Sequence, residues 1–496
     1  MLALARAAAE EFAIAQQRTP LYDALVSYAK QDITPFDVPG HKRGVDDHPL
    51  NATLGEMTLR MDANSMQELD LLSHPESVIK EAQSLAAQAF GAERAYFLVN
   101  GTTVGILAMI LATCKQNDTI IVPRNCHKSV MNGILLSGAK PVFIQPEIDE
   151  TFGIAHGISV ESVKQALEEN PHAKAILVTY PTYFGAMNEL TTICKLAHEQ
   201  NTIVLVDSAH GAHLTVLPQA LDAIQAGADF VTVSMHKTGG SLTQSSLLLQ
   251  NTDLIPGSHM QKILNMLQTT SASYLLMSSL DVARRELALF GRERFETLKP
   301  LVLQAIKELE NNSRYEVLKA DYVNKKFKQG YDWTKLVIRV NELGLTGFEV
   351  YTLLKKQYGI QAELAEGYVV MCVISYKDSE KSLNKLVSAL KDIEQRFAKS
   401  QPMHLPNVLN DEMNHLAMTP QQASQQPHEM INIYEAIGRV SADSIMIYPP
   451  GIPLVIPGEV ISPRVVQVYD FYSRNIGNVL VETQEKHQIL VIKGDR

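Results

Sequence analysis

Short apolar runs alternate with stretches of helical period from about residue 77 to residue 249 of the chain. The runs are four or five residues long and rich in Val, Ile and Leu, which is typical of strands buried on both faces of a parallel sheet. The alternation predicts βαβ units and an α/β fold with a mainly parallel seven-stranded sheet. The expected strands are Ala95–Val99, Thr119–Val122, Pro141–Ile144, Ala175–Thr179, Thr202–Val206, Asp229–Val233 and Ser246–Leu249, and the expected helices are Ser77–Phe90, Val104–Cys114, Ser129–Ser137, Ser159–Asn170, Leu190–Glu199 and Gln219–Ala226.

The rest of the chain predicts smaller units on either side of this sheet. With 496 residues the protein is too long for a single hydrophobic core. Residues 1–50 are expected to form an N-terminal helix and an arm, because an alanine-rich start is followed by turn-forming residues. Residues 51–298 would hold the major domain, 299–400 a small α+β domain, and 401–496 a C-terminal domain.

Charge and composition narrow the class of protein. The formal net charge of −10 argues against nucleic-acid binding, which needs a basic face. No stretch approaches the ~18 apolar residues of a membrane span, and acidic residues interrupt the region where a signal peptide would be apolar. The four cysteines are scattered without a C-x-x-C pair, which favours a reducing compartment. We therefore expect a cytoplasmic enzyme that acts on a small molecule and binds neither membrane nor nucleic acid.

Lys237 follows the expected strand Asp229–Val233 in the sequence Ser-Met-His-Lys-Thr-Gly-Gly. An ammonium at the end of a buried strand is costly to desolvate, so a purely structural lysine is an unusual choice there. A Schiff base with an aldehyde cofactor would use the neutral amine that such an environment favours. The alternative is a lysine whose ammonium simply reaches solvent.

Polar residues follow the other expected strands as well, at the edge where open α/β sheets bind ligands. Asp207 ends a wholly apolar strand, so its carboxylate needs a cationic or N–H partner. Asn100–Thr103 opens a helix, where hydroxyl and N–H groups suit a phosphate; an ordinary threonine N-cap is the alternative. His127 lies at the same edge, either to lie flat against an aromatic ring or to cap a helix.

Asp207 and Lys237 are separated by one βαβ unit. This pairing suits pyridoxal phosphate (PLP), because a lysine holds its aldehyde while an aspartate keeps its pyridine nitrogen protonated. His210 and His213 could suggest a metal site, but no acidic or thiol ligand accompanies them at a fitting spacing. We therefore expect PLP and no metal.

Seven segments, in order along residues 20–495, resemble the ornithine/lysine/arginine decarboxylases, which are PLP enzymes of fold type I with an aspartate-aminotransferase-like fold. The chain is similar to the short form of the family, which lacks an additional receiver-like domain. The segments are PGHKRG (39–44), NGTT (100–103), RNCHKS (124–129), PTYFG (181–185), DSAHGAH (207–213), SMHKTGGSLTQ (234–244) and YPPGIPLVIPGE (448–459).

The resemblance implies a role for each matched residue. Lys237 matches the Schiff-base lysine, Asp207 the partner of the pyridine nitrogen, and His127 the residue stacked on the ring. Glu459 would bind the cationic end of the substrate, the alternative being a surface turn residue. The implied site consists of the catalytic residues Lys237, His236, Asp207 and His127, the cofactor-binding residues Thr102, Thr103, His127, Asp207, His210, Ser234, His236, Lys237 and Thr270, and the substrate-binding residues Glu459, His210 and Tyr183.

Further expectations concern the oligomeric state, the substrate specificity and the proton donor. The segment Thr269–Tyr274 resembles the part of the family that reaches the cofactor phosphate from a neighbouring subunit, which implies a homodimer or larger homo-oligomer with shared sites. His210 stands where some lysine-specific members have tryptophan, so specificity is less clearly indicated than membership. Lys237 or His236 would return a proton to the substrate Cα after CO₂ leaves.

The expected reaction is α-decarboxylation of a basic amino acid, with L-arginine, giving agmatine for polyamine biosynthesis, as the first choice. Lysine and ornithine are the alternative substrates. An aminotransferase remains possible on the same fold, because fold alone does not decide function. A non-catalytic regulatory relative is a third interpretation, although the complete set of Lys237, Asp207 and His127 argues against it.

Overall fold

The computed structural model describes residues 2–44, 48–217, 221–404, 413–447, 452–475, 479–481, 483, 485 and 487–494. It forms two compact units. The first unit comprises Met1–Ala112 and Leu205–Glu296, and the second comprises Thr113–Val204 and Thr297–Arg496. Each unit is therefore assembled from stretches that are far apart in the sequence. The described residues contain no helix that is long and apolar enough to cross a membrane.

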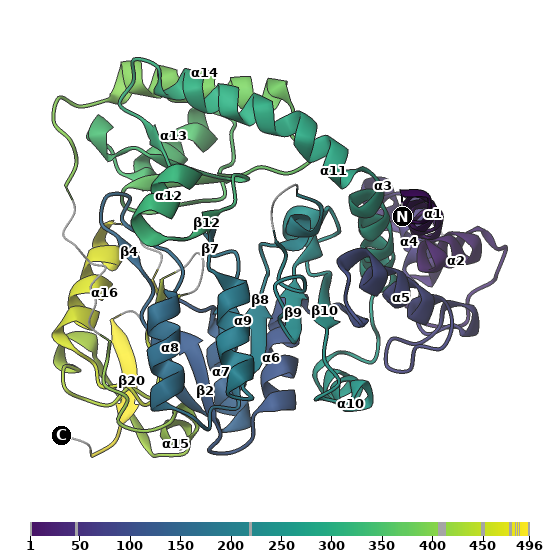
Figure 1. Cartoon of the computed structure of the whole chain (residues 1–496), viewed down its shortest axis with the longest axis horizontal. Helices are drawn as coiled ribbons and strands as arrows, with labels where there is room; N and C mark the ends of the chain where they lie inside the picture. Colours follow the sequence, from purple (N-terminus) through teal and green to yellow (C-terminus); the bar gives the residue numbers. More distant parts are fainter. Residues whose placement is uncertain are drawn as a thin grey trace. The chain divides into compact units, whose positions relative to one another are not determined.

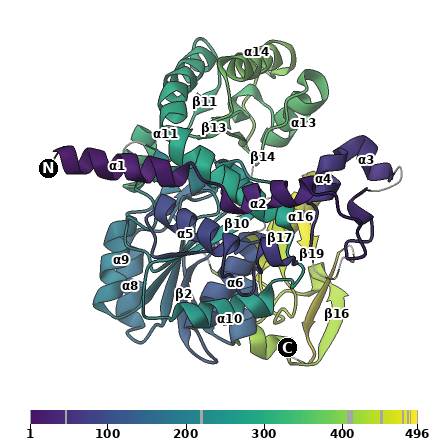
Figure 2. The same cartoon turned by 90° about the vertical axis from the view of Figure 1, so that its right-hand side faces the viewer.

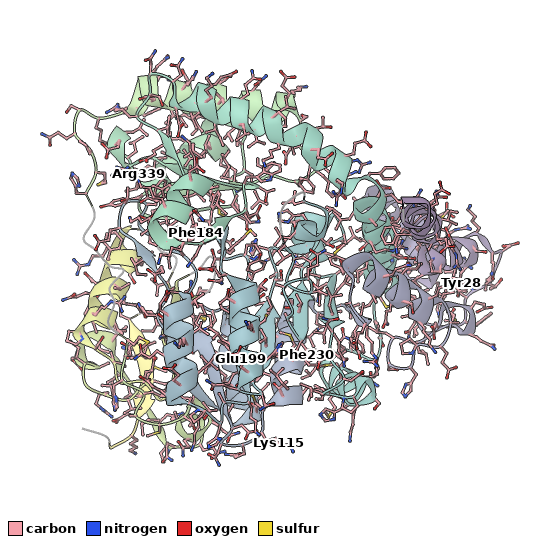
Figure 3. All side chains as sticks on the ribbon, viewed as in Figure 1. Tyr28, Lys115, Phe184, Glu199, Phe230 and Arg339 are labelled. Atoms are coloured by element: carbon pink, nitrogen blue, oxygen red, sulfur yellow. The ribbon has the colours of Figure 1, made fainter. Side chains whose placement is uncertain are left out.

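The strands of the first unit have one antiparallel member. β8 (Ile203–Asp207) lies parallel to β9 (Phe230–Val233), and β10 (Ser246–Gln250) is antiparallel to both β9 and β1 (Arg94–Leu98). All four strands are almost wholly buried, including Phe230 on β9 (Figure 3). Burial of successive residues explains why the sequence here shows apolar runs rather than alternation.

Three strands of the second unit that belong to the large sheet are parallel to one another. β2 (Thr119–Pro123) pairs with β3 (Lys140–Ile144) on one side and with β6 (Ala175–Thr179) on the other. The seven-stranded sheet has the order β1-β10-β9-β8-β6-β2-β3. The expected fold class is thus confirmed, and each of the seven expected strands is present within one residue or so of its predicted limits.

The helices expected between the strands are also present, with one exception. They are α5 (Val78–Phe90), α6 (Gly101–Thr113), α7 (Lys128–Ser137), α8 (Val160–Glu169) and α9 (Leu190–Glu199). The expected helix Gln219–Ala226 is wrong in its described part, since residues 223–227 form turns. The Asp222 carboxylate accepts from the Gln225 N–H at 2.9 Å, and Gly227 has φ of +100°, so the segment makes one turn and then reverses.

The N-terminal helices α1 (Leu2–Gln16) and α2 (Pro20–Lys30) lie beside α5, at the purple end of the chain in Figure 1. The buried Arg284–Asp281 ion pair, with 2.6 Å between Nη2 and Oδ1, holds their connection. Arg284 donates to the Gln16 carbonyl at 2.7 Å, and Asp281 accepts from the Leu21 N–H at 3.0 Å. Both residues lie on α11 (Tyr274–Glu310), which continues through Pro300. The first unit is completed by α3 (Pro49–Leu54), α4 (Glu56–Met61) and α10 (Gly257–Leu267).

The second unit also contains the expected small α+β region. Strands β13 (Lys335–Arg339) and β15 (Val369–Val373) form its centre, in a sheet of order β11-β13-β15-β14. Helices α13 (Gly347–Tyr358) and α14 (Glu380–Phe397) bury leucine and valine against this sheet. The remaining elements here are β4 (Ile148–Asp149), β5 (Ile154–Ala155), β7 (Ala186–Met187), β11 (Glu316–Val317), α12 (Ala320–Phe327), β12 (Gly330–Tyr331) and β14 (Leu364–Ala365).

The C-terminal part of the second unit has a core of its own. Figure 2 shows β16 (His428–Asn432), β17 (Ile445–Ile447) and β19 (Val479–Val481) in this region with α16 (Pro463–Asn475). Isoleucine and valine from these strands pack with α16 in one cluster. Also present are α15 (Pro420–Ser424), β18 (Ile452–Val455) and β20 (Gln488–Ile492). The domain boundaries expected from the sequence stay a prediction.

Candidate active site

Lys237 lies in a single π-helical turn, Met235–Gly239, directly after β9. π-Helical turns are rare and concentrate at functional sites. The turn buries Met235, Thr238 and Gly239, while Lys237 itself is exposed. Its Nζ lies 3.0 Å from Nε2 of His210, a residue that is 6% exposed. The turn is therefore mostly buried, whereas the residue Lys237 is exposed.

Asp207 is the last residue of β8, the strand parallel to β9. It is 4% exposed, and its Oδ1 accepts from the Ala209 N–H at 3.1 Å. Because parallel neighbours end at the same edge of a sheet, Asp207 and His210 share an edge with Lys237. The structure thus brings together three residues that the sequence placed after two different strands.

The start of α6 meets the end of β9 through two hydroxyls. Thr102 Oγ1 and Ser234 Oγ are 3.1 Å apart, and Thr103 is exposed on the next residue of the helix. Gly105 permits this approach, because a Cβ there would lie 2.4 Å from Cγ2 of Thr232 on β9. One hydrogen bond between two hydroxyls uses one hydrogen, which leaves the other for an anion. With the N–H groups of the first turn, these hydroxyls are suited to bind an anion.

His236 is half-buried on the same turn as Lys237, and its Nδ1 lies 3.1 Å from the Ser245 carbonyl oxygen. A carbonyl only accepts, so Nδ1 carries the hydrogen and Nε2 is the acceptor in the neutral ring. Burial lowers the pKa of His236; the hydrogen bond to Ser245 opposes this, and the charge of Lys237 adds to it. The ring is therefore held neutral beside the amine, in a fixed tautomer.

The residues of the first unit fit PLP. The fit consists of an accessible amine, a buried carboxylate, and hydroxyls at a helix N-terminus, all at one sheet edge. In addition, Thr238 Oγ1 and Ser246 Oγ are buried here and have no hydrogen-bond partner within the described residues. Thr270, also in this unit, is exposed four residues before α11 begins.

His127 lies in the second unit, where it caps α7. Its Nδ1 accepts from the Ser129 N–H at 3.2 Å and lies 2.8 Å from Ser129 Oγ. These contacts fix the plane of the ring, while the side chain remains exposed. The capping function considered from the sequence is therefore present, and a stacking function is compatible with it.

Tyr183 also lies in the second unit, next to the small α+β region. Its hydroxyl donates to Oε1 of Glu363 at 2.7 Å, and its ring lies 6.0 Å from that of Phe184. Phe184 belongs to the core of that region (Figure 3). Tyr183 is thus anchored at both ends of its side chain.

Glu459 is completely buried, so it is not a surface turn residue. Its Oε2 accepts from Arg124 Nη2 at 2.9 Å, from Asn414 Nδ2 at 3.2 Å and from the Ile456 N–H at 3.1 Å. Oε1 is buried and has no hydrogen-bond partner within the residues that the structure describes. Burial raises the pKa of Glu459, and the charge of Arg124 opposes that rise.

The comparisons with known proteins identify the family of the chain. The family model for the Orn/Lys/Arg decarboxylase major domain matches residues 19–382, and that for the C-terminal domain matches residues 404–476. Arginine decarboxylase of Bacillus subtilis is 43% identical over 485 residues, which cover 97% of this chain and 99% of the relative. The chain belongs to the Orn/Lys/Arg decarboxylase family.

Solved structures place the fold within the same group of enzymes. Lysine decarboxylase LdcF of Francisella novicida superposes with a TM-score of 0.82 at 21% identity, covering 95% of this chain and 81% of that one. A structure of SPT with PLP has a TM-score of 0.50 at 15% identity, covering 64% of this chain and 75% of that one. Both likenesses concern the fold, which is that of fold type I PLP enzymes.

Family membership does not explain every feature of the site. Arg124, in the family segment 124–129, and Asn414 were not among the predicted site residues, yet they are the partners of Glu459. Arg43, in the segment 39–44, donates to the carbonyls of Tyr28 and Ala29 at 3.0 and 2.9 Å, and so caps α2. Its guanidinium also lies 5.2 Å from the centre of the ring of Tyr28, which is labelled in Figure 3. The sequence shows where Arg124 and Arg43 stand in the chain, but it does not show which distant residues they contact.

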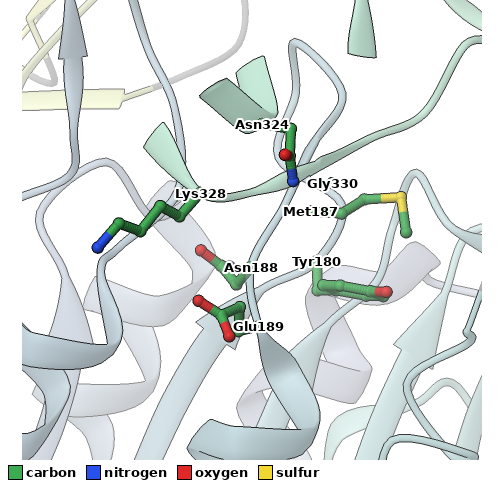
Figure 4. Close-up of a pocket in the computed structure, with 7 residues that line it drawn as sticks. All are labelled: Tyr180, Met187, Asn188, Glu189, Asn324, Lys328 and Gly330. Carbon is green, nitrogen blue, oxygen red and sulfur yellow. The ribbon is translucent and has the colours of Figure 1, made fainter. Parts of the chain in front are cut away.

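A separate hollow of about 430 Å³ opens in the second unit, beyond the end of β6. Figure 4 shows it lined by Tyr180, Met187, Asn188, Glu189, Asn324, Lys328 and Gly330. The Asn188 side chain connects two backbone segments next to this hollow, since it accepts from the Ile158 N–H and donates to the Thr179 carbonyl. The lining contains none of the predicted site residues.

Proposed function

We propose that the protein is a PLP-dependent arginine decarboxylase, which converts L-arginine to agmatine and CO₂. The observation that carries the proposal is the Lys237 amine, 3.0 Å from His210 and at the same sheet edge as the buried Asp207. The 43% identity to an arginine decarboxylase along nearly the whole chain supports arginine over lysine or ornithine.

In this proposal each side chain has a defined task. Lys237 Nζ would hold the aldehyde of the cofactor. The Asp207 carboxylate would keep a proton on the pyridine nitrogen. Bound PLP supplies the sink for the electron pair that remains when CO₂ leaves. The hydroxyls of Thr102 and Ser234, with the start of α6, would receive the phosphate, and the family resemblance assigns His127 to the cofactor ring.

A proton must return to the substrate Cα after decarboxylation. Lys237 can deliver it as an ammonium group. His236, whose Nδ1 hydrogen is bound to the Ser245 carbonyl, would deliver it only after Nε2 takes up a proton. Because burial lowers the pKa of His236, the neutral form is favoured, and we assign the proton transfer to Lys237.

We assign the distal cation of the substrate to Glu459. The carboxylate uses Oε2 for contacts within the protein, which leaves Oε1 for a guanidinium or ammonium donor. A charge-assisted hydrogen bond in a buried position is worth more than one in water. Tyr183 and His210 would line the remainder of the substrate site.

The test is CO₂ release from arginine, lysine and ornithine, assayed in parallel with added PLP. Arginine should give the highest kcat/KM and agmatine as product. A 2-keto acid in place of CO₂ would contradict the proposal, because it would indicate transamination. Absence of both products would contradict an enzymatic function.

We also propose that the working unit is a homodimer with sites shared between subunits. The N-terminal arm exposes the large apolar side chains Phe36 (94%) and Val38 (58%), Leu54 at the end of α3 is 53% exposed, and Thr270 is exposed as well. Apolar groups at this exposure favour burial against a second copy. Light scattering should give the mass of at least a dimer at assay concentration, and an active monomer would contradict the proposal. The cytoplasm remains the expected location.

A further inference from the structure

The turn that carries His127 is anchored to three other parts of the second unit. The Arg124 N–H donates to the Ile144 carbonyl on β3 at 2.8 Å, and Asn125 Nδ2 donates to the His156 carbonyl at 3.1 Å. The Cys126 N–H closes the turn on the Pro123 carbonyl at 3.2 Å. The third anchor is the Arg124 side chain, which reaches the C-terminal part.

The guanidinium of Arg124 is enclosed by C-terminal residues. Its Nη2 donates to Glu459 Oε2 at 2.9 Å and to the Leu454 carbonyl at 3.3 Å, and its side chain is only 11% exposed. Asn414 Nδ2 donates to the same two acceptors, at 3.2 and 2.9 Å. The central carbon of the guanidinium lies 5.2 Å from the centre of the Phe143 ring on β3. Both hydrogen bonds come from Nη2, whereas Nη1 is buried and has no hydrogen-bond partner among the described residues.

An ion pair this buried is a poor source of net stability, because desolvating both charges offsets their attraction. Its stronger consequence is geometric, since a planar guanidinium accepts few arrangements of its partners. Arg124 lies three residues before His127 in a closed turn, so a shift of Arg124 is transmitted to the imidazole. Ser129 then fixes the plane of the ring from the other side.

We propose that Arg124 is a positioning residue, through which Glu459 and the Leu454 carbonyl of the C-terminal part set the imidazole of His127. The inference rests on the proposed function, in which that imidazole lies against the cofactor ring. Arg124 itself touches neither cofactor nor substrate in this proposal. The C-terminal part would thereby control cofactor binding as well as supply a substrate carboxylate.

The test compares Arg124→Met, Arg124→Lys, His127→Ala and the double variant Arg124→Met/His127→Ala. The readouts are the Kd for PLP, the visible circular dichroism of the bound cofactor, and kcat and KM separately. Arg124→Met should weaken PLP binding about tenfold and reduce the dichroic band, and Arg124→Lys should restore part of both. In the His127→Ala background the same change should have little further effect, since residues that act through one another are non-additive.

A matched control exists in the same unit. Arg439 Nη2 also pairs with a carboxylate, Glu429 at 2.6 Å, and with a backbone carbonyl, Ile492 at 2.7 Å, and its side chain is 15% exposed. Arg439→Met should lower thermal stability without changing the Kd for PLP or the dichroic band. The Glu429 side chain is 39% exposed, so the variant measures the loss of a largely buried arginine from an ion pair whose carboxylate still reaches solvent.

Two results would overturn the inference. One is an Arg124→Met variant that binds PLP as tightly as the wild type and keeps its dichroic band. The other is an effect of Arg124→Met that is fully additive with that of His127→Ala, which would show that Arg124 acts on stability alone. Failure of the proposed function is distinct, since the wild type would then lack PLP binding or CO₂ release before any variant is compared.

Discussion

Lys237 and Arg124 are both cations that follow a strand of the sheet, one in each unit, but their surroundings are opposite. Lys237 is exposed, and its amine lies 3.0 Å from the imidazole of His210. Arg124 is largely buried against the carboxylate of Glu459, and it also contacts the Leu454 carbonyl and the Phe143 ring. A lysine can exchange its proton and react, whereas a guanidinium stays charged and holds geometry. The comparison separates the residue assigned to chemistry from the residue assigned to position.

The largest effect is expected at the reactive cation. Lys237→Ala should lower decarboxylation by about 10⁴-fold or more, because no other amine holds the cofactor. The fold should persist, since the side chain is exposed. Visible absorption of the lysine-bound cofactor and CO₂ release measure the change, with the exposed Lys262→Ala on α10 as control. Activity near that of the wild type would remove Lys237 from the mechanism.

The next effect concerns the carboxylate behind it. Asp207→Asn should retain PLP but reduce kcat by orders of magnitude, because a neutral partner no longer holds the proton of the pyridine nitrogen. The Ala209 N–H can still donate to the amide oxygen, so local structure should survive. Steady-state kinetics with saturating PLP provide the measurement. An unchanged kcat would make Asp207 a structural residue.

Glu459→Gln tests the comparison between Lys237 and Arg124 from the other side, because it changes the carboxylate that pairs with the buried Arg124. We expect arginine binding to weaken by about 1.5–3 kcal/mol, the range for a hydrogen bond to a charged group. The amide oxygen can still accept from Arg124 and the Ile456 N–H, so PLP affinity should change less than in Arg124→Met. KM for arginine and lysine, with the Kd for PLP, tests this expectation. If neither KM nor kcat/KM moves, the substrate cation is bound elsewhere.

The smallest effect should come from a buried acid with no assigned chemistry. Asp149 accepts from Lys326 Nζ and the Tyr322 hydroxyl, both at 3.0 Å, and lies 3.3 Å from His156 Nε2. Burial raises the pKa of Asp149, but hydrogen bonds from His156 and Lys326 outweigh it and lower the pKa to about 2. Asp149→Asn should therefore cost about 2.5 kcal/mol of stability at neutral pH, with kcat unchanged.

The pH dependence of that stability has a definite sign. A carboxylate with a depressed pKa stabilises the fold above its unfolded pKa of about 3.9, and the contribution disappears as pH falls toward 2. The wild type should unfold at a higher temperature than Asp149→Asn. This difference should be constant above about pH 5 and should disappear as the pH falls from 4 to 2. A constant difference down to pH 2 would contradict this assignment.

The sequence by itself determined the elements and the chemistry at the strand ends. Continuous Val, Ile and Leu runs specify strands buried on both faces, and all seven strands are where that pattern placed them. Asp207, Ser234 and Lys237 follow strands directly, so strand order alone was enough to put them at one edge. Where a side chain used a local hydrogen bond, as Asp222 does with Gln225, the helical pattern was misleading.

Only the tertiary structure decided which distant groups satisfy buried charges. Arg124 and Glu459 are 335 residues apart, and Leu21 and Asp281 are 260 apart, yet each pair is in direct contact. Periodicity describes which face of an element is apolar, but a buried charge takes whatever partner the packed chain brings within about 3 Å. A sequence pattern does not show which residues come within hydrogen-bonding distance in the folded chain. The lysine that we propose as the reactive residue could therefore be found from the sequence, whereas the arginine that we propose as a positioning residue could not.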